Sequence, residues 1–279
     1  MLNNTHLEVL LYEPDSNKIF KNTDVKGGIA ITRHDNTITN EPIIIFTPYN
    51  ELNNILHKVL KAKDYSSLSK IVVSRTAYRL SKKLHQDYPE AIRQLSKGHA
   101  YDMSTNIFER LPQVFYDEKP NDNKEYARIL GRLDKKRTFK YIKREYINDV
   151  KNYSKYKVCI AKANGDGALG NIGTPIICEP NTGSTESFLS VGCFGTRAEA
   201  EACEKYLKTK FFRTMLGVLK VTQDITPEKF KYVPLQNFFP NSDIAWSKTV
   251  SEIDEQLYEK YKLNKEEINF INNKVKKME

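Results

Sequence analysis

Residues 186–219, ESFLSVGCFGTRAEAEACEKYLKTKFFRTMLGVL, place a strand pattern directly before a helix pattern and so decide the fold class. The stretch 186–194 is rich in residues that favour strands. Thr196 and Glu199 then have the spacing of a capping box, in which each side chain satisfies a free backbone N–H at a helix start. Apolar residues at helical spacing predict one face of a long helix: Leu207, Phe211, Met215, Val218 and Leu219.

Two shorter helices are predicted downstream of this segment. Ser251 with Asp254, and Asn264 with Glu267, stand at the spacing of helix N-terminal capping pairs. We therefore interpret residues 240–279 as a helical tail.

Strand patterns are more frequent upstream. Apolar and β-branched runs predict strands at residues 7–12, 25–32, 43–47, 137–142 and 156–161. A helix is predicted after Asn50, which stands as its cap. Residues 66–83 look helical at both ends with a β-branched middle, and the Gly, Pro and Asn content of 164–184 indicates a loop. The mixture predicts an α/β (mixed α+β) protein.

Basic side chains are concentrated between Lys124 and Lys162, a stretch that contains 13 Lys or Arg and only four Asp or Glu. This excess equals the +9 net charge of the whole chain, and six aromatic residues interleave it. Such a pattern favours a nucleic-acid surface over a merely solvated basic face. The predicted phosphate contacts are Arg128, Arg132, Lys135, Lys136, Arg137, Lys140, Lys143 and Arg144.

Candidate base-reading residues lie outside this group. Asn164 stands in the polar loop beside Lys162, and Thr222 with Gln223 follows the long helix. Amide and hydroxyl side chains can pair with base edges in the major groove. For each of them, a solvated or capping side chain is the alternative.

A second pattern suggests a different chemistry. Pro14-Asp15 followed by Asp24-Val25-Lys26 loosely matches metal-dependent nucleases, in which two carboxylates hold Mg²⁺ and a lysine polarises the attacking water. A surface turn followed by a strand is the structural alternative. The rival hypothesis is thus a Mg²⁺-dependent endonuclease that uses Asp15, Asp24 and Lys26.

The four cysteines, at 159, 178, 193 and 203, form no Cys-x-x-Cys pair, so no metal site is predicted and we expect reduced thiols. No apolar run approaches the roughly 20 residues of a membrane span. The N-terminus has no secretory signal pattern. These features predict a cytoplasmic protein that does not act in a membrane.

Several segments together carry a resemblance to a known family. They are FKNTDVKGGIAIT, YPEAIRQLSKGHAYDMSTNIFERLPQVFY, LGRLDKKRTFKYI, YKVCIAKANGDGALG, EPNTGSTESFLSVGCF, YLKTKFFRTMLGVLKVTQDITPEKFKYVPLQNF and DIAWSKTVSEIDEQLYEKYKL. In this order they resemble the C-terminal part of Eco57I-like type II restriction-modification enzymes, which carry an N6-adenine methylase module. The KTKFFR…VTQDITPEKFKYVPL segment is also similar to target recognition domains of type I specificity subunits.

The resemblance implies three parts. Residues 1–47 would be the last strands of a methyltransferase-like domain, 48–239 a DNA target recognition domain with a mixed sheet, and 240–279 the helical tail. The S-adenosylmethionine loop and the Asn-Pro-Pro-Tyr motif of the family are absent, and Thr47-Pro48-Tyr49 only approaches the latter. S-adenosylmethionine is therefore implied for a missing methylase half, and no cofactor is expected in this chain.

The function that the resemblance implies is recognition of a specific double-stranded DNA sequence. The expected partners are duplex DNA and a methyltransferase catalytic domain or subunit. Catalysis is not expected in this chain.

Overall fold

The structure is a computed structural model that describes residues 2–13, 15–23, 25, 28–43, 45–163, 168–220 and 222–278. The chain forms two compact units, residues 1–58 and 59–279. The boundary between them falls inside helix α1 (Asn50–Leu60). Residues 240–279, which the sequence suggests as a separate tail, belong to the second compact unit.

The first unit contains a two-stranded antiparallel sheet. It consists of β1 (Leu7–Glu13) and β2 (Ile29–His34), with the 3₁₀ turn η1 (Ser16–Lys18) between them. The predicted strand at 7–12 is confirmed, and that at 25–32 is confirmed from Ile29 onward.

The strand predicted at 43–47 is wrong for the described residues of that stretch, which are irregular. The last residue of this stretch, Thr47, forms hydrogen bonds with a side chain instead of with a neighbouring strand. The backbone N–H of Thr47 donates to Asn53 Oδ1 (3.0 Å), and Asn53 Nδ2 donates to the Thr47 carbonyl (3.1 Å). Asn53 lies in α1, which begins at Asn50 itself. Both peptide groups of Thr47 that a ladder would use are therefore already satisfied.

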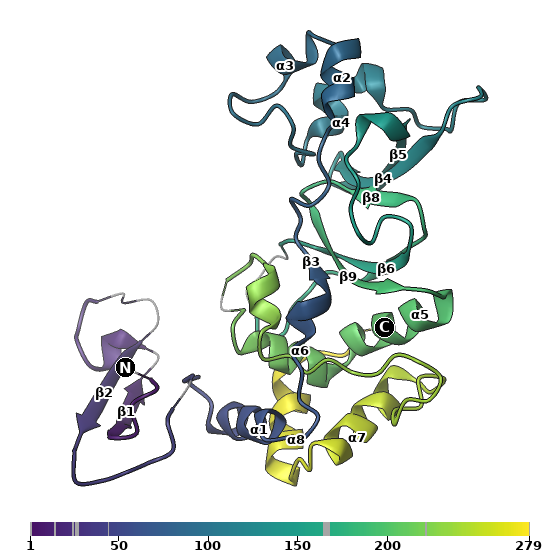
Figure 1. The fold of residues 1–279 in the computed structure, drawn as a ribbon. Helices are drawn as coiled ribbons and strands as arrows, with labels where there is room; N and C mark the ends of the chain where they lie inside the picture. The colour runs from purple at the N-terminus through teal and green to yellow at the C-terminus, as the bar shows by residue number, and fades with distance from the viewer. Residues whose placement is uncertain are drawn as a thin grey trace. The chain divides into compact units, whose positions relative to one another are not determined.

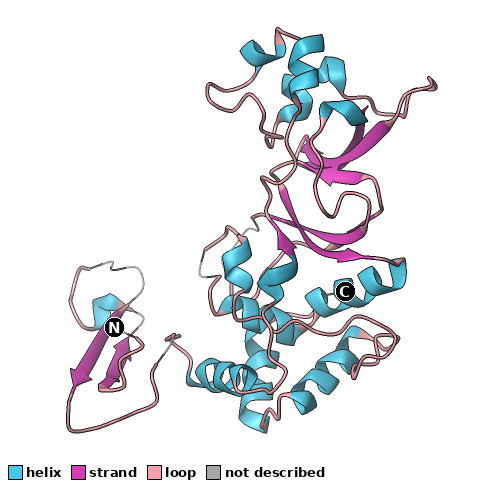
Figure 2. Ribbon diagram, viewed as in Figure 1, coloured by secondary structure: helices cyan, strands magenta, loops and turns pink. Residues whose placement is uncertain are grey.

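The second unit contains two sheets (Figure 2). One has the order β3 (Val72–Val73), β9 (Phe188–Phe194), β6 (Tyr156–Ala161) and β7 (Ile176–Cys178), all antiparallel. The other has the order β5 (Lys136–Lys143), β4 (Tyr126–Leu133) and β8 (Thr182–Ser184), in which β4 and β8 are parallel. The chain is thus a mixed α/β protein.

Helices cover both ends of this pair of sheets, so that the second unit consists of successive layers (Figure 1). At the β4–β5 end lie α2 (Lys82–Asp87), α3 (Ala91–Gln94) and α4 (Ile107–Arg110). On the β6–β9 sheet lie α5 (Arg197–Lys208) and α6 (Lys210–Gly217), followed by α7 (Val250–Lys260) and α8 (Lys265–Lys274). Short 3₁₀ segments connect them: η2 (Leu68–Ile71), η3 (Pro112–Val114), η4 (Arg144–Tyr146) and η5 (Pro227–Phe230).

Strand β4 contributes to two hydrophobic clusters at once. Ala127 and Ile129 pack with Leu84, Phe108 and other residues of the α2–α4 layer. Leu130, on the opposite side of β4, packs with residues of the β3–β9–β6–β7 sheet: Cys159, Cys178 and Phe188. Because successive residues of a strand point to opposite faces, β4 lies between the two clusters and joins the layers.

The long helix predicted from Thr196 is divided in two at Thr209. The ψ of Thr209 is 148°, and its hydroxyl accepts the backbone N–H of Phe212 (3.1 Å) as the N-cap of α6. The carboxylate of Asp254, from α7, accepts the next free N–H groups, those of Lys210 (2.9 Å) and Phe211 (2.8 Å). A tertiary contact thus satisfies the start of a second helix, which a local pattern does not reveal.

The remaining cap predictions have mixed outcomes. Thr196 accepts from the Glu199 N–H as predicted, but the Glu199 carboxylate accepts the N–H of Gly195 (3.1 Å) instead of that of Thr196. Asn264 with Glu267 forms a complete capping box, as predicted. The pair Ser251 and Asp254 is wrong: α7 begins two residues earlier, with Thr249 and Glu252 as its capping box.

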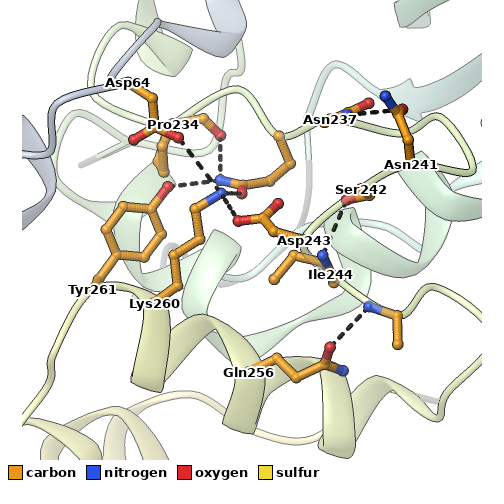
Figure 3. Close-up of polar contacts among 12 residues, drawn as sticks. Asp64, Pro234, Asn237, Asn241, Ser242, Asp243, Ile244, Gln256, Lys260 and Tyr261 are labelled. Atoms are coloured by element: carbon orange, nitrogen blue, oxygen red, sulfur yellow. Dashed lines mark hydrogen bonds and ion pairs between the residues drawn. The ribbon is translucent and has the colours of Figure 1, made fainter.

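A lysine-centred polar cluster holds the segment before α7 against that helix (Figure 3). Lys260 Nζ lies 2.8 Å from Asp243 Oδ2 and donates to Gln236 Oε1 (2.9 Å). Gln236 Nε2 in turn donates to the Tyr261 hydroxyl (2.8 Å). Asp64, near the start of the unit, lies 3.8 Å from the same ammonium. The C-terminal helices are thereby joined to the rest of the second unit.

Three of the four cysteines, Cys159, Cys178 and Cys203, are buried free thiols, and Cys193 is exposed. None of the helices in the described part of the chain has the length and apolar character of a membrane span.

Candidate nucleic-acid interface

Most of the predicted phosphate contacts lie on the β4–β5 hairpin. Its two strands are joined by Asp134 and Lys135, whose φ angles are 49° and 62°. Two successive residues in the left-handed region define a type I′ turn, which matches the twist of paired strands. The turn therefore places Lys135 and Lys136 at the tip of a two-stranded ribbon.

The strand register divides the basic residues between two faces. Arg132 lies opposite Arg137, and the Arg128–Tyr141 pair lies on the same face. The intervening pairs, Leu133 with Lys136 and Ile129 with Lys140, point to the other face. The basic segment is therefore not a single-sided ribbon.

Several of these cations are committed to contacts within the protein. Lys140 Nζ lies 2.7 Å from Asp117 Oδ1. Arg144 pairs with Asp149 and donates from Nη1 to the Ile147 carbonyl (2.9 Å). These two predicted contacts therefore have intramolecular roles.

Lys143 and Arg128 lie against aromatic rings. Lys143 Nζ hydrogen-bonds to the Tyr146 hydroxyl (3.2 Å), which raises the pKa of Lys143. The Arg128 guanidinium lies 3.8 Å from the centroid of the Phe139 ring, and its buried Nε has no hydrogen-bond partner in the described structure. Both side chains are half-buried, so they are less accessible to a phosphate than the tip is.

The tip itself is exposed and positively charged. Lys135 and Lys136 are exposed, and their ammonium groups make no hydrogen bond or ion pair with the described residues. Arg132 Nη2 donates to the Lys135 carbonyl (2.7 Å), which braces the turn. Asp134 is the one acid of the turn. Two unpaired ammonium groups on a braced ribbon are available for an external anion.

Arg137 connects the tip to the segment that precedes β7. Its Nη2 donates to the Thr174 carbonyl (2.5 Å), and burial lowers its pKa. A Cβ built on Gly173 would lie 3.5 Å both from Arg137 Nη2 and from the Ala161 side chain. The hairpin tip therefore lies beside the residues that lead to Lys162.

Lys162 lies beside the segment that carries Thr222 and Gln223. The Ile225 N–H donates to the Lys162 carbonyl (2.6 Å), and Ala163 forms a bridge with Asp224. Thr222 and Gln223 are exposed, and Lys162 is half-buried. Lys162 is thus a neighbour of Thr222 and Gln223, which lie far from it in the sequence, whereas Asn164 lies outside the described residues.

Arg75 is a further basic residue at this edge, and sequence reasoning missed it. It follows β3, and its guanidinium lies 3.9 Å from Glu186, just before β9. The next residue, Ser187, accepts the Lys162 N–H through its carbonyl (2.9 Å). Only the pairing of β3 with β9 brings Arg75 here, so no local signal identifies it.

We call this group the hairpin-tip surface. It comprises Arg75, Arg132, Lys135, Lys136, Arg137, Lys162, Thr222 and Gln223. Among the described residues of the same segments the acids are Asp134, Glu186 and Asp224, so basic side chains outnumber acidic ones there. A mixed surface with a cationic excess suits a polyanion that also offers hydrogen-bond donors.

The residues of the rival nuclease hypothesis are only partly described. Asp15 caps η1 by accepting the Asn17 N–H (3.1 Å). Asp24 and Lys26 lie outside the described residues. Within the described part of the chain, no group of three or more His, Cys, Asp or Glu is arranged to hold a metal ion.

No protein-family model, curated protein or solved structure matches this chain significantly.

Proposed function

We propose that the second unit reads double-stranded DNA for a methyltransferase, or for a fused methyltransferase-endonuclease, of the restriction-modification type. The observation that carries this proposal is the convergence of three distant segments at the hairpin-tip surface. The β4–β5 tip supplies unpaired lysines, the end of β6 supplies Lys162, and the segment after α6 supplies Thr222 and Gln223.

A two-stranded ribbon has the dimensions to enter the major groove of B-DNA. The lysines of the tip would neutralise phosphates and set the register, which is the sequence-independent part of binding. Thr222 and Gln223 would then face base edges, since Gln pairs with adenine and Thr with several bases. Base flipping and methyl transfer would take place in the partner that binds S-adenosylmethionine.

The first test removes charge from the tip without disturbing the turn. Lys135→Gly with Lys136→Gln deletes two unpaired ammonium groups, and glycine adopts a positive φ without steric cost. We expect duplex affinity at about 0.1 M salt to fall ten- to hundredfold, and the slope of log K against log salt to decrease by about 2. Fluorescence anisotropy of the full chain with duplexes at several salt concentrations measures both.

The matched control carries the same charge change elsewhere. Lys97→Gln with Lys265→Gln removes two exposed lysines from other elements. This variant should keep most of the affinity of the unaltered chain. Equal loss in both double variants would show that only net charge matters, and unchanged binding in the tip variant would refute the proposed surface.

A separate variant tests whether the protein recognises a specific DNA sequence. Gln223→Ala should leave the affinity for non-specific DNA nearly unchanged. It should weaken binding to the preferred DNA sequence by about 1–3 kcal/mol, the contribution of one base-reading contact. Selection from a random duplex library with both proteins measures the preference. An identical preference in the two selections would remove Gln223 from the base-reading residues.

A further inference from the structure

A second candidate site lies on the other side of the α5–α6 layer. An open cavity of about 630 Å³ is lined by residues of α6, α7 and α8, by the end of α5 and by neighbouring segments. Pockets for small organic molecules usually have volumes of about 300–1,000 Å³. None of the residues of the hairpin-tip surface lines this cavity.

Two cationic side chains of α6 line the cavity, and the groups to which they donate hydrogen bonds are neutral. Lys210 Nζ donates to the side-chain oxygen of Asn272 (2.8 Å). The buried Arg213 donates to the carbonyls of Thr209 and Lys276, from Nε and Nη2. Its Nη1 makes no hydrogen bond to any described residue. The wall therefore contains positive charge that no acidic side chain of the described residues pairs directly.

The one buried acid of this wall is already engaged. Both oxygens of Asp254 accept backbone N–H groups, at Lys210 and Phe211. The other acids that line the cavity, Glu255 and Glu259, are exposed. Asp254 therefore neutralises the start of α6 and leaves the guanidinium of Arg213 to attract a second anion.

The same wall contains the buried hydroxyl of Tyr258. Tyr258 is 7% exposed, and its hydroxyl makes no hydrogen bond with the described residues. A buried polar group without a partner is costly, and native proteins contain few of them. An oxygen atom of a bound ligand would accept this O–H and remove the cost.

The remainder of the lining suits an apolar group. Leu263, Ile268 and Met278 are half-buried and line the same cavity. We infer that the cavity binds a small organic anion, whose phosphate or carboxylate group meets Arg213 and Tyr258 and whose apolar part lies on Leu263 and Ile268. This site is independent of the proposed DNA surface.

The test compares three probes that share an aromatic ring: phenyl phosphate, phenylacetate and the neutral benzyl alcohol. Isothermal calorimetry on the full chain should show binding of an anion at least tenfold tighter than that of the alcohol. The two anions identify which oxyanion the site prefers. If neither anion binds more tightly than benzyl alcohol up to about 10 mM, the inference is overturned.

Tyr258→Phe separates a ligand contact from a structural one. Because the hydroxyl makes no hydrogen bond with the described residues, the ligand-free variant should melt at the same temperature or higher. Its affinity for the preferred anion should fall about tenfold. Tyr261→Phe is the control: its hydroxyl accepts from Gln236, so that variant should lose stability and keep anion affinity. A Tyr258→Phe protein with lower stability and unchanged affinity would contradict the assignment.

Discussion

Replacing Lys157 by Met is expected to lower the free energy of unfolding by about 3–5 kcal/mol, because it leaves buried carbonyls without donors. Lys157 is 1% exposed. Its ammonium lies within hydrogen-bond distance of four carbonyls, those of Lys155 (2.9 Å), Asn152 (3.0 Å), Tyr153 (3.1 Å) and Glu179 (3.3 Å), so its three N–H groups are shared among them. This lysine belongs to the basic stretch of the sequence, yet it fixes the turn before β6 and is inaccessible to DNA.

The size of this effect follows from the acceptors that would lose their donor. The Tyr153 carbonyl also accepts the Asn181 N–H (2.8 Å), and that of Asn152 accepts the Lys155 N–H (3.3 Å). The carbonyls of Lys155 and Glu179 depend more on the ammonium, and each unsatisfied group costs about 1–3 kcal/mol. Burial lowers the pKa of Lys157, so the charged form carries a desolvation cost that these four contacts offset.

Urea unfolding of the variant measures this loss. Lys155→Met is the matched control, since that side chain is exposed on the same turn, and it should change stability by less than about 0.5 kcal/mol. Equal stability of Lys157→Met and the unaltered chain would mean that water satisfies the carbonyls.

Asp254→Ala is expected to lower the free energy of unfolding by about 2–4 kcal/mol, because two backbone N–H groups at the start of α6 lose their acceptor. The same carboxylate is the contact that joins α7 to α6 at this point. Glu255→Ala, a neighbouring exposed acid, is the control and should have little effect.

The loss should also depend on pH. Burial raises the pKa of the Asp254 carboxyl from 3.8 to about 6, while the N–H groups of Phe211 and Lys210 and the charges of Arg213 and Lys210 oppose the rise. Between these two values the folded chain holds more protons than the unfolded chain, so this group makes stability fall as pH rises.

Alanine lacks this proton. The destabilisation by Asp254→Ala should therefore be about 1 kcal/mol larger near pH 5 than near pH 7.5. Unfolding curves of both proteins at the two pH values give the difference. A larger loss at the higher pH would show that the carboxylate is stabilised in its charged form and that its pKa is not raised.

The accuracy of the sequence predictions depended on local signals. Strands β6 and β9 were identified from their apolar runs, and the caps of α5 and α8 from their spacing. Strand β4 was missed because it is buried on both faces, with Ile129 in one cluster and Leu130 in the other, and so shows no simple alternation.

The candidate site also depends on contacts that local sequence patterns do not contain. The basic stretch indicated where to look, but adjacent strand residues face opposite ways, and distant partners engage several cations. Lys140 meets Asp117, 23 positions away, and Arg137 meets Thr174, 37 positions away. The availability of Lys135 and Lys136 follows from their place in a tight turn, which the sequence did not reveal.

By itself the sequence determined the mixed α/β class, strands β6 and β9 and the concentration of basic charge, because each depends on neighbours within a few residues. Only the tertiary structure decided which cations remain unpaired, where the long helix divides and which segments share the hairpin-tip surface. Strand pairing and buried hydrogen bonds join residues that are far apart in the chain, and their energies depend on burial that no local pattern contains.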